Sequence, residues 1–399
     1  MKSIKEIYKI GNGPSSSHTM GPKRAAEQFT MRCSGVDRYR VTLYGSLAAT
    51  GRGHLTDKAI LSVLEPIAPT EICWKPDVVL PFHPNGMLFE GLKEEKVIDS
   101  WTIYSTGGGA LANEETKTEL LPDIYSMSTI EEIKEWCRNE GKTYWEYVEE
   151  CEGPEIWDYL DRVWTVMCET IQRGLNNDGV LPGGLKVARK ASTYYVKSKS
   201  YTGSLASRAC IYAYALAVAE ENAAGGEVVT APTCGSSGVL PAVIFHLSTS
   251  RDFLRIRILR ALATAGLFGN VVKTNSSISG AAVGCQGEIG VACAMAAAAA
   301  CQLFGGTPSQ IEYAAEMGLE HHLGLTCDPV CGLVQVPCIE RNAIAAARAL
   351  DANTYATLSD GQHLVTFDKV VEVMNETGTN LPSLYRETSE GGLAKNYRK

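Results

Sequence analysis

The spacing of apolar residues changes near residue 122, and this change most constrains the fold. Before it, short apolar segments bounded by Gly, Pro or Asn predict strands over residues 38–47, 71–74, 86–90 and 97–106, with one helix over 56–66. After it, apolar residues at helical spacing predict helices over residues 128–141, 154–175, 204–226, 238–248, 290–304 and 307–324. We expect no series of strands beyond residue 125. The chain is therefore predicted to be multidomain, with an α+β domain over residues 1–122 and an all-α domain over residues 127–399.

Local signals refine this division. Ser128 is the expected N-cap of the first long helix, and Glu131 would complete a capping box. The most apolar run, residues 290–304, has roughly 15 residues, fewer than the ~20 that cross a bilayer, so we expect a buried helix there. The N-terminal segment MKSIKEIYKI lacks the apolar core of a signal peptide, which favours a cytoplasmic protein.

The negative charge of the chain is concentrated in one stretch. The formal net charge is −8, and residues 114–162 hold 15 acidic and 5 basic residues. The remainder is near neutral, so we expect neither a nucleic-acid surface nor a polybasic membrane surface, and the predicted partner is a small molecule. We interpret the acidic stretch as a solvated helical face, with a partner-binding surface as the alternative.

The first candidate site is the serine-rich segment Gly11–Pro22, which leads into a predicted helix. Pro22 suits the first turn of that helix, where backbone N–H groups attract anions such as a carboxylate. The side chains that would gather there are Ser15, Ser16, Ser17, His18 and Thr19. The alternative is an ordinary capping loop whose hydroxyl groups satisfy only their own helix.

Two further loops open predicted helices. In residues 50–57, Thr56 or Asp57 is the expected N-cap, and the positive end of the helix dipole would keep His54 neutral and usable as a base near pH 7. A structural loop histidine is the alternative. Residues 231–238 form either another anion site or a tight turn between helices that needs small residues.

Cysteine usage points to thiols rather than disulfides. Thirteen cysteines is an odd number, and the cytosol is reducing, so a disulfide framework is not predicted. Cys285, Cys327 and Cys338 are separated by 42 and 11 residues and lie among Gly or Pro residues, where backbone can approach an inorganic cluster. No C-x-x-C pair supports a zinc ribbon, and spacing alone leaves iron–sulfur ligation and inert buried thiols both open.

Six segments resemble the iron–sulfur-dependent L-serine dehydratases, also called L-serine ammonia-lyases. The family patterns read close to GPSSSHTxGP, GxGHxTD, APTxGSxG, SISGAxVGCQGE, EHxLGxTCDP and VQxPCIERN. This chain carries them at residues 13–22, 51–57, 231–238, 277–288, 320–329 and 334–342. The resemblance covers nearly the whole chain, from residue 11 to the SLYRETSEGGLAK segment that ends at Lys395.

The resemblance implies a metal centre, an oligomeric state and a role for the N-terminal domain. It implies that three cysteines hold a 4Fe-4S cluster whose remaining iron faces the substrate, and it places these ligands on Cys285, Cys327 and Cys338. It also implies a homodimer, and an N-terminal domain that is similar to the substrate-binding regulatory domain of some phosphoglycerate dehydrogenases and closes the site.

This chain departs from the family at two places. It ends at Lys399 without the terminal cysteine that caps the fourth iron in some members. It also carries Cys331 where the family usually has glycine, either as a resting fourth ligand or as a packing thiol.

The resemblance further implies that L-serine loses water and is deaminated to pyruvate and ammonium, with the cluster as a Lewis acid on the C3 hydroxyl group and the carboxylate. We expect His54 to remove the Cα proton, with His18 as the second candidate. Ser15, Ser16, Ser17 and Thr19 are expected to hold the substrate carboxylate or to order their loop. From the helical side, polar groups of the substrate are expected to contact Asn275, Ser276 and Ser277.

Three alternatives differ in chemistry. L-Threonine differs from L-serine by one methyl group, which a pocket discriminates by ~1–3 kcal/mol. An amino-acid-binding regulatory protein would keep the pocket without catalysis. A pyridoxal-phosphate dehydratase would use Lys273 as its Schiff-base lysine and residues 234–238 as its phosphate loop. No extended α/β pattern surrounds Lys273, so we expect no pyridoxal phosphate.

Overall fold

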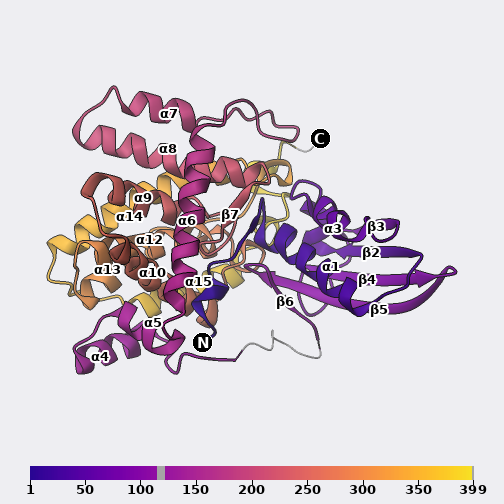
Figure 1. Ribbon diagram of the computed structural model, residues 1–399, viewed down its shortest axis with the longest axis horizontal. Helices are drawn as coiled ribbons and strands as arrows, with labels where there is room; N and C mark the ends of the chain where they lie inside the picture. The colour runs from indigo at the N-terminus through magenta and orange to yellow at the C-terminus, as the bar shows by residue number, and fades with distance from the viewer. Residues whose placement is uncertain (115–121, 398–399) are drawn as a thin grey trace.

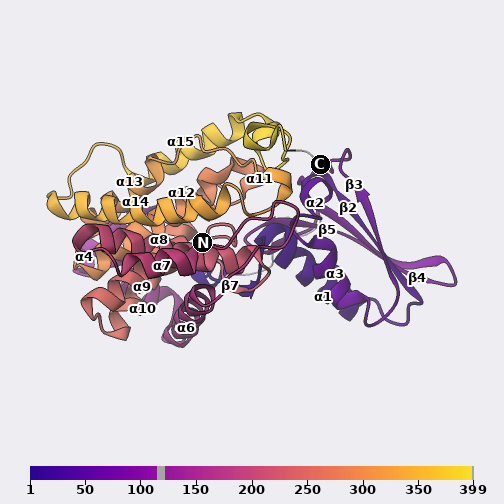
Figure 2. The same ribbon diagram turned by 90° about the horizontal axis from the view of Figure 1, so that it is seen from above.

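A computed structural model describes residues 1–114 and 122–397 of the chain. Figures 1 and 2 show a β-sheet flanked by helices at one end of the molecule and a larger helical body at the other. The expected mixture of an N-terminal sheet region and a helical C-terminal part is therefore confirmed. The domain limits at residues 122 and 127 stay predictions.

The N-terminal region contains a five-stranded sheet with the strand order β3-β2-β4-β5-β6. β2 and β3 are parallel, and the other neighbouring strands are antiparallel. Helices α1 and α3 pack on the sheet, where Phe29 and Ile60 meet Val41, Leu43 and Phe89 in a core of its own. The elements are β1 (Ile10–Asn12), α1 (Gly21–Arg32), β2 (Arg38–Tyr44), α2 (Gly45–Thr50), α3 (Thr56–Leu64), β3 (Thr70–Lys75), β4 (Gly86–Lys93), β5 (Lys96–Gly107) and β6 (Ala110–Ala112).

The strand predicted over residues 38–47 is wrong in its last three residues, because β2 ends at Tyr44. Gly45 has a φ of +50°, and its N–H group donates to the carbonyl of Val78, so the chain leaves the sheet there and enters α2. This early exit brings Ser46 of α2 to the candidate site described below.

The helical body is arranged around α12 (Ile289–Leu303), the alanine-rich helix that the sequence predicts to be buried. All of its residues except Gln302 are buried, and its neighbours include α9, α10, α13 and α14. The other elements are α4 (Ile130–Glu140), α5 (Tyr144–Glu152), α6 (Ile156–Leu175), α7 (Ala191–Ser198), α8 (Gly203–Ala223), β7 (Glu227–Val229), α9 (Val239–Arg251), α10 (Arg255–Asn275), α11 (Gly280–Val283), α13 (Pro308–Glu320), α14 (Cys338–Leu358) and α15 (Phe367–Asn380). Within the described ranges, no helix has the length and apolar character needed to cross a membrane.

Two expectations for this half are corrected. Thr129 rather than Ser128 is the N-cap of α4, and Glu132 rather than Glu131 completes the capping box. The carboxylate of Asp368 adds to this cap by accepting hydrogen bonds from the N–H groups of residues 130 and 131.

One short strand, β7, occurs beyond residue 125, and it belongs to no series of strands within the described ranges. β7 pairs with β1 in a two-stranded antiparallel sheet. This pairing arises because the first residues of the chain join the helical body, where Met1, Ile4 and Tyr8 are buried in its core.

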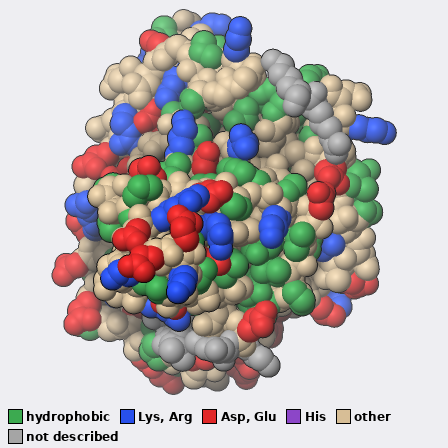
Figure 3. All heavy atoms as spheres, turned by 90° about the vertical axis from the view of Figure 1, so that its right-hand side faces the viewer, with side chains coloured by type: hydrophobic (Ala, Val, Ile, Leu, Met, Phe, Trp, Pro, Cys, Tyr) green, Lys and Arg blue, Asp and Glu red, His purple; other side chains and the backbone are tan. Residues whose placement is uncertain are grey.

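Charged side chains of both signs are interspersed at the sheet end of the molecule (Figure 3). Arg32–Asp99, Arg38–Glu71 and Arg40–Glu90 form ion pairs there. In the acidic stretch, residues 115–121 lie outside the described residues. The acidic side chains from residue 122 to residue 162 are exposed or partly exposed, as expected for a solvated face.

Candidate active site

The predicted cysteine ligands meet where three segments of the helical body converge. Cys285 lies in the turn before α12, Cys327 in the loop after α13, and Cys338 is the first residue of α14. The sulfur atoms of Cys285 and Cys327 and a carboxylate oxygen of Glu288 lie within 4.8 Å of one another. Cys338 is not part of this group of three, but burial and then the charge of Cys285 raise the pKa of its thiol well above its ordinary value, so the two thiols are near enough to interact.

The backbone of Gly280 forms one wall of this cysteine cluster. A Cβ atom at this position would lie 2.6 Å from a carboxylate oxygen of Glu288 and 3.0 Å from the sulfur of Cys327. Arg341 lies on another side, where its guanidinium interacts with Cys285 and Cys338 and donates to the carbonyl of Thr326 at 2.7 Å. The cluster therefore combines close backbone approach with a nearby positive charge.

The C-terminal tail places a carboxylate between the cysteines and two histidines. The N–H group of Cys327 donates to the carbonyl of Tyr385 at 2.8 Å, and that of Glu387 donates to the carbonyl of Cys327 at 2.7 Å. The Glu387 carboxylate lies 3.6 Å from Nδ1 of His18. Burial, followed by the charges of Glu288 and Cys285, raises the pKa of Glu387 well above its usual range.

His54 is held in the tautomer that a general base requires. The hydroxyl group of Thr50 donates its hydrogen to the carbonyl of Ser46 at 3.0 Å, so it accepts from Nδ1 of His54 at 3.2 Å. Nε2 of His54 therefore carries the free lone pair, and this buried atom has no hydrogen-bond partner among the described residues. Burial lowers the pKa of His54 to about 3, so desolvation favours the neutral ring.

His18 packs against His54 with ring centroids 4.5 Å apart, but both of its nitrogens are engaged. Ser46 donates its hydrogen to the carbonyl of Glu387, so its oxygen accepts from Nε2 of His18 at 3.1 Å. Nδ1 of His18 lies 2.9 Å from the hydroxyl oxygen of Ser17. Burial and the neighbouring His54 lower the pKa of His18 well below its ordinary value.

The serine-rich segment orders the two histidines from the N-terminal side. The N–H group of His18 donates to the hydroxyl oxygen of Ser15 at 3.1 Å, and the hydroxyl group of Thr19 donates to the carbonyl of His54 at 2.7 Å. The hydroxyl group of Ser16 makes no hydrogen bond within the described ranges, although the residue is only 3% exposed. Pro22 lies in the first turn of α1, as expected.

Other sequence-based candidates lie differently from expectation. The N-cap of α3 is Leu55, with a φ of 56°, and not Thr56 or Asp57. The hydroxyl group of Thr56 instead donates to the carbonyl of His18, which ties the two histidine loops together. In residues 231–238, the hydroxyl group of Thr233 donates to the Glu288 carboxylate at 2.9 Å, so this turn supports the cysteine cluster.

The three predicted substrate contacts on the helical side make hydrogen bonds to residues outside the cysteine cluster. Asn275 is exposed at the end of α10 and donates to the carbonyl of Ser128, and Ser276 bonds to Asn375 of α15. The hydroxyl group of Ser277 accepts a local hydrogen bond from the N–H group of Ser279. The exposed thiol of Cys331 donates to the carbonyl of Tyr397 at 2.8 Å, in the C-terminal tail.

Sequence reasoning missed several residues that complete the site. They are Ser46, Ser279, Gly280, Glu288, Arg341 and Glu387. The hydroxyl oxygen of Ser279 is buried beside Gly280 and has no partner among the described residues. Four of the six lie in segments that carry the family patterns, Glu387 lies in the C-terminal segment where the resemblance ends, and Ser46 had no local signal.

Comparisons with known proteins agree with this geometry. Residues 103–394 match the family described as serine dehydratase alpha chain, and residues 3–75 match the serine dehydratase beta chain. An L-serine dehydratase of Streptomyces coelicolor is 41% identical over an alignment of 448 positions, which covers 99% of this chain and 98% of the relative. L-serine dehydratase 2 of Escherichia coli is 41% identical at the same coverage, and an L-serine dehydratase of Helicobacter pylori is 36% identical over 98% of both chains. The resemblance found in the motifs is thereby confirmed, and the chain belongs to the serine dehydratase family.

Proposed function

We propose that this protein is a lyase that dehydrates L-serine and releases pyruvate and ammonium, with a 4Fe-4S cluster held by Cys285, Cys327 and Cys338. The observation that supports the proposal is that Cys285 and Cys327 lie together with Glu288, while Glu387 lies beside His18 and His54, whose Nε2 atom has no hydrogen-bond partner among the described residues. The relatives named above are all L-serine dehydratases, which supports the choice of substrate. The homodimer and the cytoplasmic location remain predictions from the sequence.

The residues present fit such a cluster. A hydrogen bond from Cys285 and then burial raise the pKa of the Cys327 thiol well above its ordinary value, so Cys327 is a poor thiolate by itself. A bound metal centre would offset the repulsion between neighbouring thiolates and so favour the thiolate form, which is the form that binds metal. The backbone approach at Gly280 and the guanidinium of Arg341 suit a cluster with negatively charged ligands. When bound, the cluster supplies Lewis-acid stabilisation to the departing hydroxide.

The remaining chemistry belongs to side chains of this protein. Nε2 of His54 is the acceptor for the Cα proton, and Thr50 keeps it unprotonated. The hydroxyl groups of Ser16 and Ser279, which lack partners among the described residues, are free to donate to the substrate carboxylate. Ser15, Ser17 and Thr19 hold the loop and the histidines in place. The aminoacrylate released after loss of water tautomerises and hydrolyses in solution.

An assay of the anaerobically purified protein tests the reaction and the substrate together. We expect pyruvate from L-serine with a kcat/KM at least ~10-fold above that for 2-oxobutyrate formation from L-threonine, which is the discrimination that one methyl group allows. A preference for L-threonine would establish the alternative substrate. Binding of L-serine by calorimetry without any keto acid formed would show a regulatory protein and overturn the proposal.

Thr50→Val should lower kcat about 10-fold, because the His54 ring would lose the contact that fixes its tautomer. Thr50→Ser retains the hydroxyl group and should restore most of the rate. Steady-state kinetics of both variants, with iron content measured on the same samples, check this role. Equal losses in the two variants would show that Thr50 acts only through packing.

The pKa of His54 predicts the acid side of the pH profile. Since burial lowers this pKa to about 3, the ring stays unprotonated as the pH falls from 8 to 5.5. We therefore expect kcat/KM for L-serine to show no acid limb attributable to a histidine across that range. A fall in kcat/KM below a pKa near 6.5 that is absent in His54→Gln would contradict the low pKa assigned to His54.

Gly280→Ala should reduce bound iron and turnover by ~10-fold or more, because its methyl group would press on the Cys327 sulfur and the Glu288 carboxylate. Gly184→Ala is a matched control, since a Cβ atom there meets nothing within 4 Å and its φ is not positive. Iron analysis of both purified variants checks the expectation. Full iron occupancy in Gly280→Ala would show that this wall does not face the cluster.

A further inference from the structure

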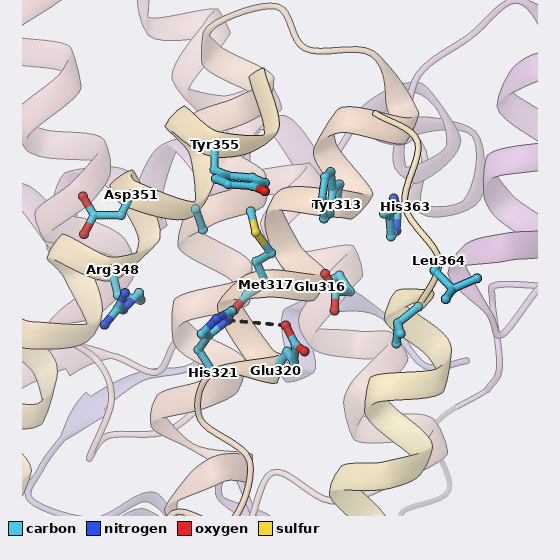
Figure 4. A pocket seen from close by; sticks show the side chains of 12 residues that line it. Tyr313, Glu316, Met317, Glu320, His321, Arg348, Asp351, Tyr355, His363 and Leu364 are labelled. Carbon is cyan, nitrogen blue, oxygen red and sulfur yellow. Dashed lines mark hydrogen bonds and ion pairs between the residues drawn. The ribbon is translucent and has the colours of Figure 1, made fainter. Parts of the chain in front are cut away.

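A cavity of about 470 Å³ lies in the helical body between α13, α14 and the loop before α15 (Figure 4). Its walls include Tyr313, Glu316, Glu320, Arg348, Tyr355 and His363. None of the residues that line it belongs to the cysteine cluster or to the histidine pair. Its volume falls within the range of small-molecule sites.

Glu316 is an unpartnered carboxylate in this cavity. The residue is only 3% exposed, yet its side chain makes no hydrogen bond or ion pair with any described residue. Glu312, one turn earlier on α13, shows how the same helix satisfies a buried carboxylate. It accepts from Nζ of Lys134 at 3.0 Å and from the N–H group of Phe367 at 2.9 Å. A carboxyl group on a nearly buried residue that lacks a protein partner and lines a cavity is available to pair with a cationic group of a ligand.

Aromatic rings surround the space in front of Glu316. The rings of Tyr313 and Tyr355 lie 6.0 Å apart at 87°, and the ring of His363 stacks on Tyr313 at 4.3 Å. Figure 4 shows Tyr313, Tyr355 and Glu316 around the same space, with the Glu320–His321 pair below them. Electron-rich ring faces together with a carboxylate form the usual recognition site for an organic ammonium group.

The charges on the other walls do not neutralise Glu316. Asp351 of α14 is paired with Arg208, and Arg348 of the same helix is exposed, with no ion-pair partner among the described residues. A metal ion is a poorer fit than an organic cation. Within the described ranges, no three potential metal-ligand atoms in this cavity lie within 4.8 Å of one another.

We propose that this cavity is a second binding site, separate from the catalytic site, for a small organic ammonium compound whose cationic group pairs with Glu316 and whose carbon chain packs on Tyr313 and Tyr355. The electrostatics agree with this assignment. Burial, followed by the charges of Glu320 and Glu312, raises the pKa of Glu316 to about 8. A bound ammonium group would favour the ionised carboxylate.

Isothermal titration calorimetry of the anaerobic full-length holoenzyme at pH 8 tests the site with three matched probes: propylammonium, 1-propanol and propionate. We expect saturable binding of propylammonium alone, weakened at least ~10-fold in Glu316→Gln, as for loss of a charge-assisted contact. Glu320→Gln, at the exposed rim, should weaken it less than ~5-fold. The proposal would be overturned if 1-propanol bound as tightly as propylammonium, or if Glu316→Gln bound propylammonium as tightly as the wild-type protein. Saturable binding of potassium chloride without binding of propylammonium would overturn it as well.

The folding of the variant can be checked independently. Glu316→Gln removes a buried group that ionises near pH 8, so its melting temperature at pH 8 should equal or exceed that of the wild-type protein. Its turnover of L-serine should be unchanged, because Glu316 lies outside the catalytic machinery. A protein without L-serine turnover that still bound propylammonium through Glu316 would contradict the proposed function and leave this site intact.

Discussion

Serine in place of Cys327 should lower kcat for L-serine at least ~10³-fold and leave the anaerobically purified protein without stoichiometric iron. Cys327 is 4% exposed, and its sulfur lies beside Glu288 and Cys285. Its backbone is held on both sides by residues 385 and 387, so the substitution removes a ligand while the loop keeps its place. Iron, acid-labile sulfide and pyruvate formation measured on one sample check this result.

Cys293→Ser is the matched control for that substitution. Cys293 is a fully buried thiol of α12, and it donates to the carbonyl of Ala345 at 3.4 Å, a bond that a serine hydroxyl group can keep. We expect full iron content, turnover within ~3-fold of wild type, and a loss of stability of about 1–2 kcal/mol. Loss of iron from both variants alike would show that unfolding, and not ligation, explains the effect at Cys327.

Replacing His54 by alanine should lower kcat by ~10²–10⁴-fold while iron content stays at the wild-type level. Its Nε2 atom carries the free lone pair in the site, whereas both nitrogens of His18 are engaged by Ser17 and Ser46. His18→Ala should therefore act through the position of His54 and have a smaller effect. Steady-state kinetics with L-serine, compared at saturating substrate, separate the two roles.

His246→Gln controls for the loss of any buried histidine. His246 is 9% exposed, bonds to Ser207, and lies on α9 away from the cysteines. We expect near-normal turnover. If His54→Ala keeps near-normal turnover and His18→Ala does not, His18 is the base and the tautomer argument is wrong.

The sequence predicts the elements whose apolar pattern has a clear period. Strands β3, β4 and β5 lie where the alternation places them, and α12 is buried as its composition indicates. Helix α10 was missed because it is buried over most of its length and has no continuous polar face. Helix α14 has no clear apolar period either, because most of its buried residues are alanines.

The cysteines and histidines of the candidate site could be predicted because each lies in a segment that carries a family pattern. Glu288 follows Cys285 by three residues and could have been found there. Glu387 reaches the site through a backbone bridge to Cys327, a contact across 60 residues that no local pattern reveals. Asn275 stays a predicted substrate contact, although the structure places it at the exposed end of α10. It lies near Ser279 in sequence, but the chain turns after α10 and leaves it on the outer surface.

The most direct test of the account is Mössbauer spectroscopy of protein enriched in ⁵⁷Fe, recorded with and without L-serine. The account predicts about four iron atoms per chain, of which about one quarter changes its signal when L-serine is added. An unchanged spectrum in the presence of saturating L-serine, or full activity in protein free of iron, would contradict it.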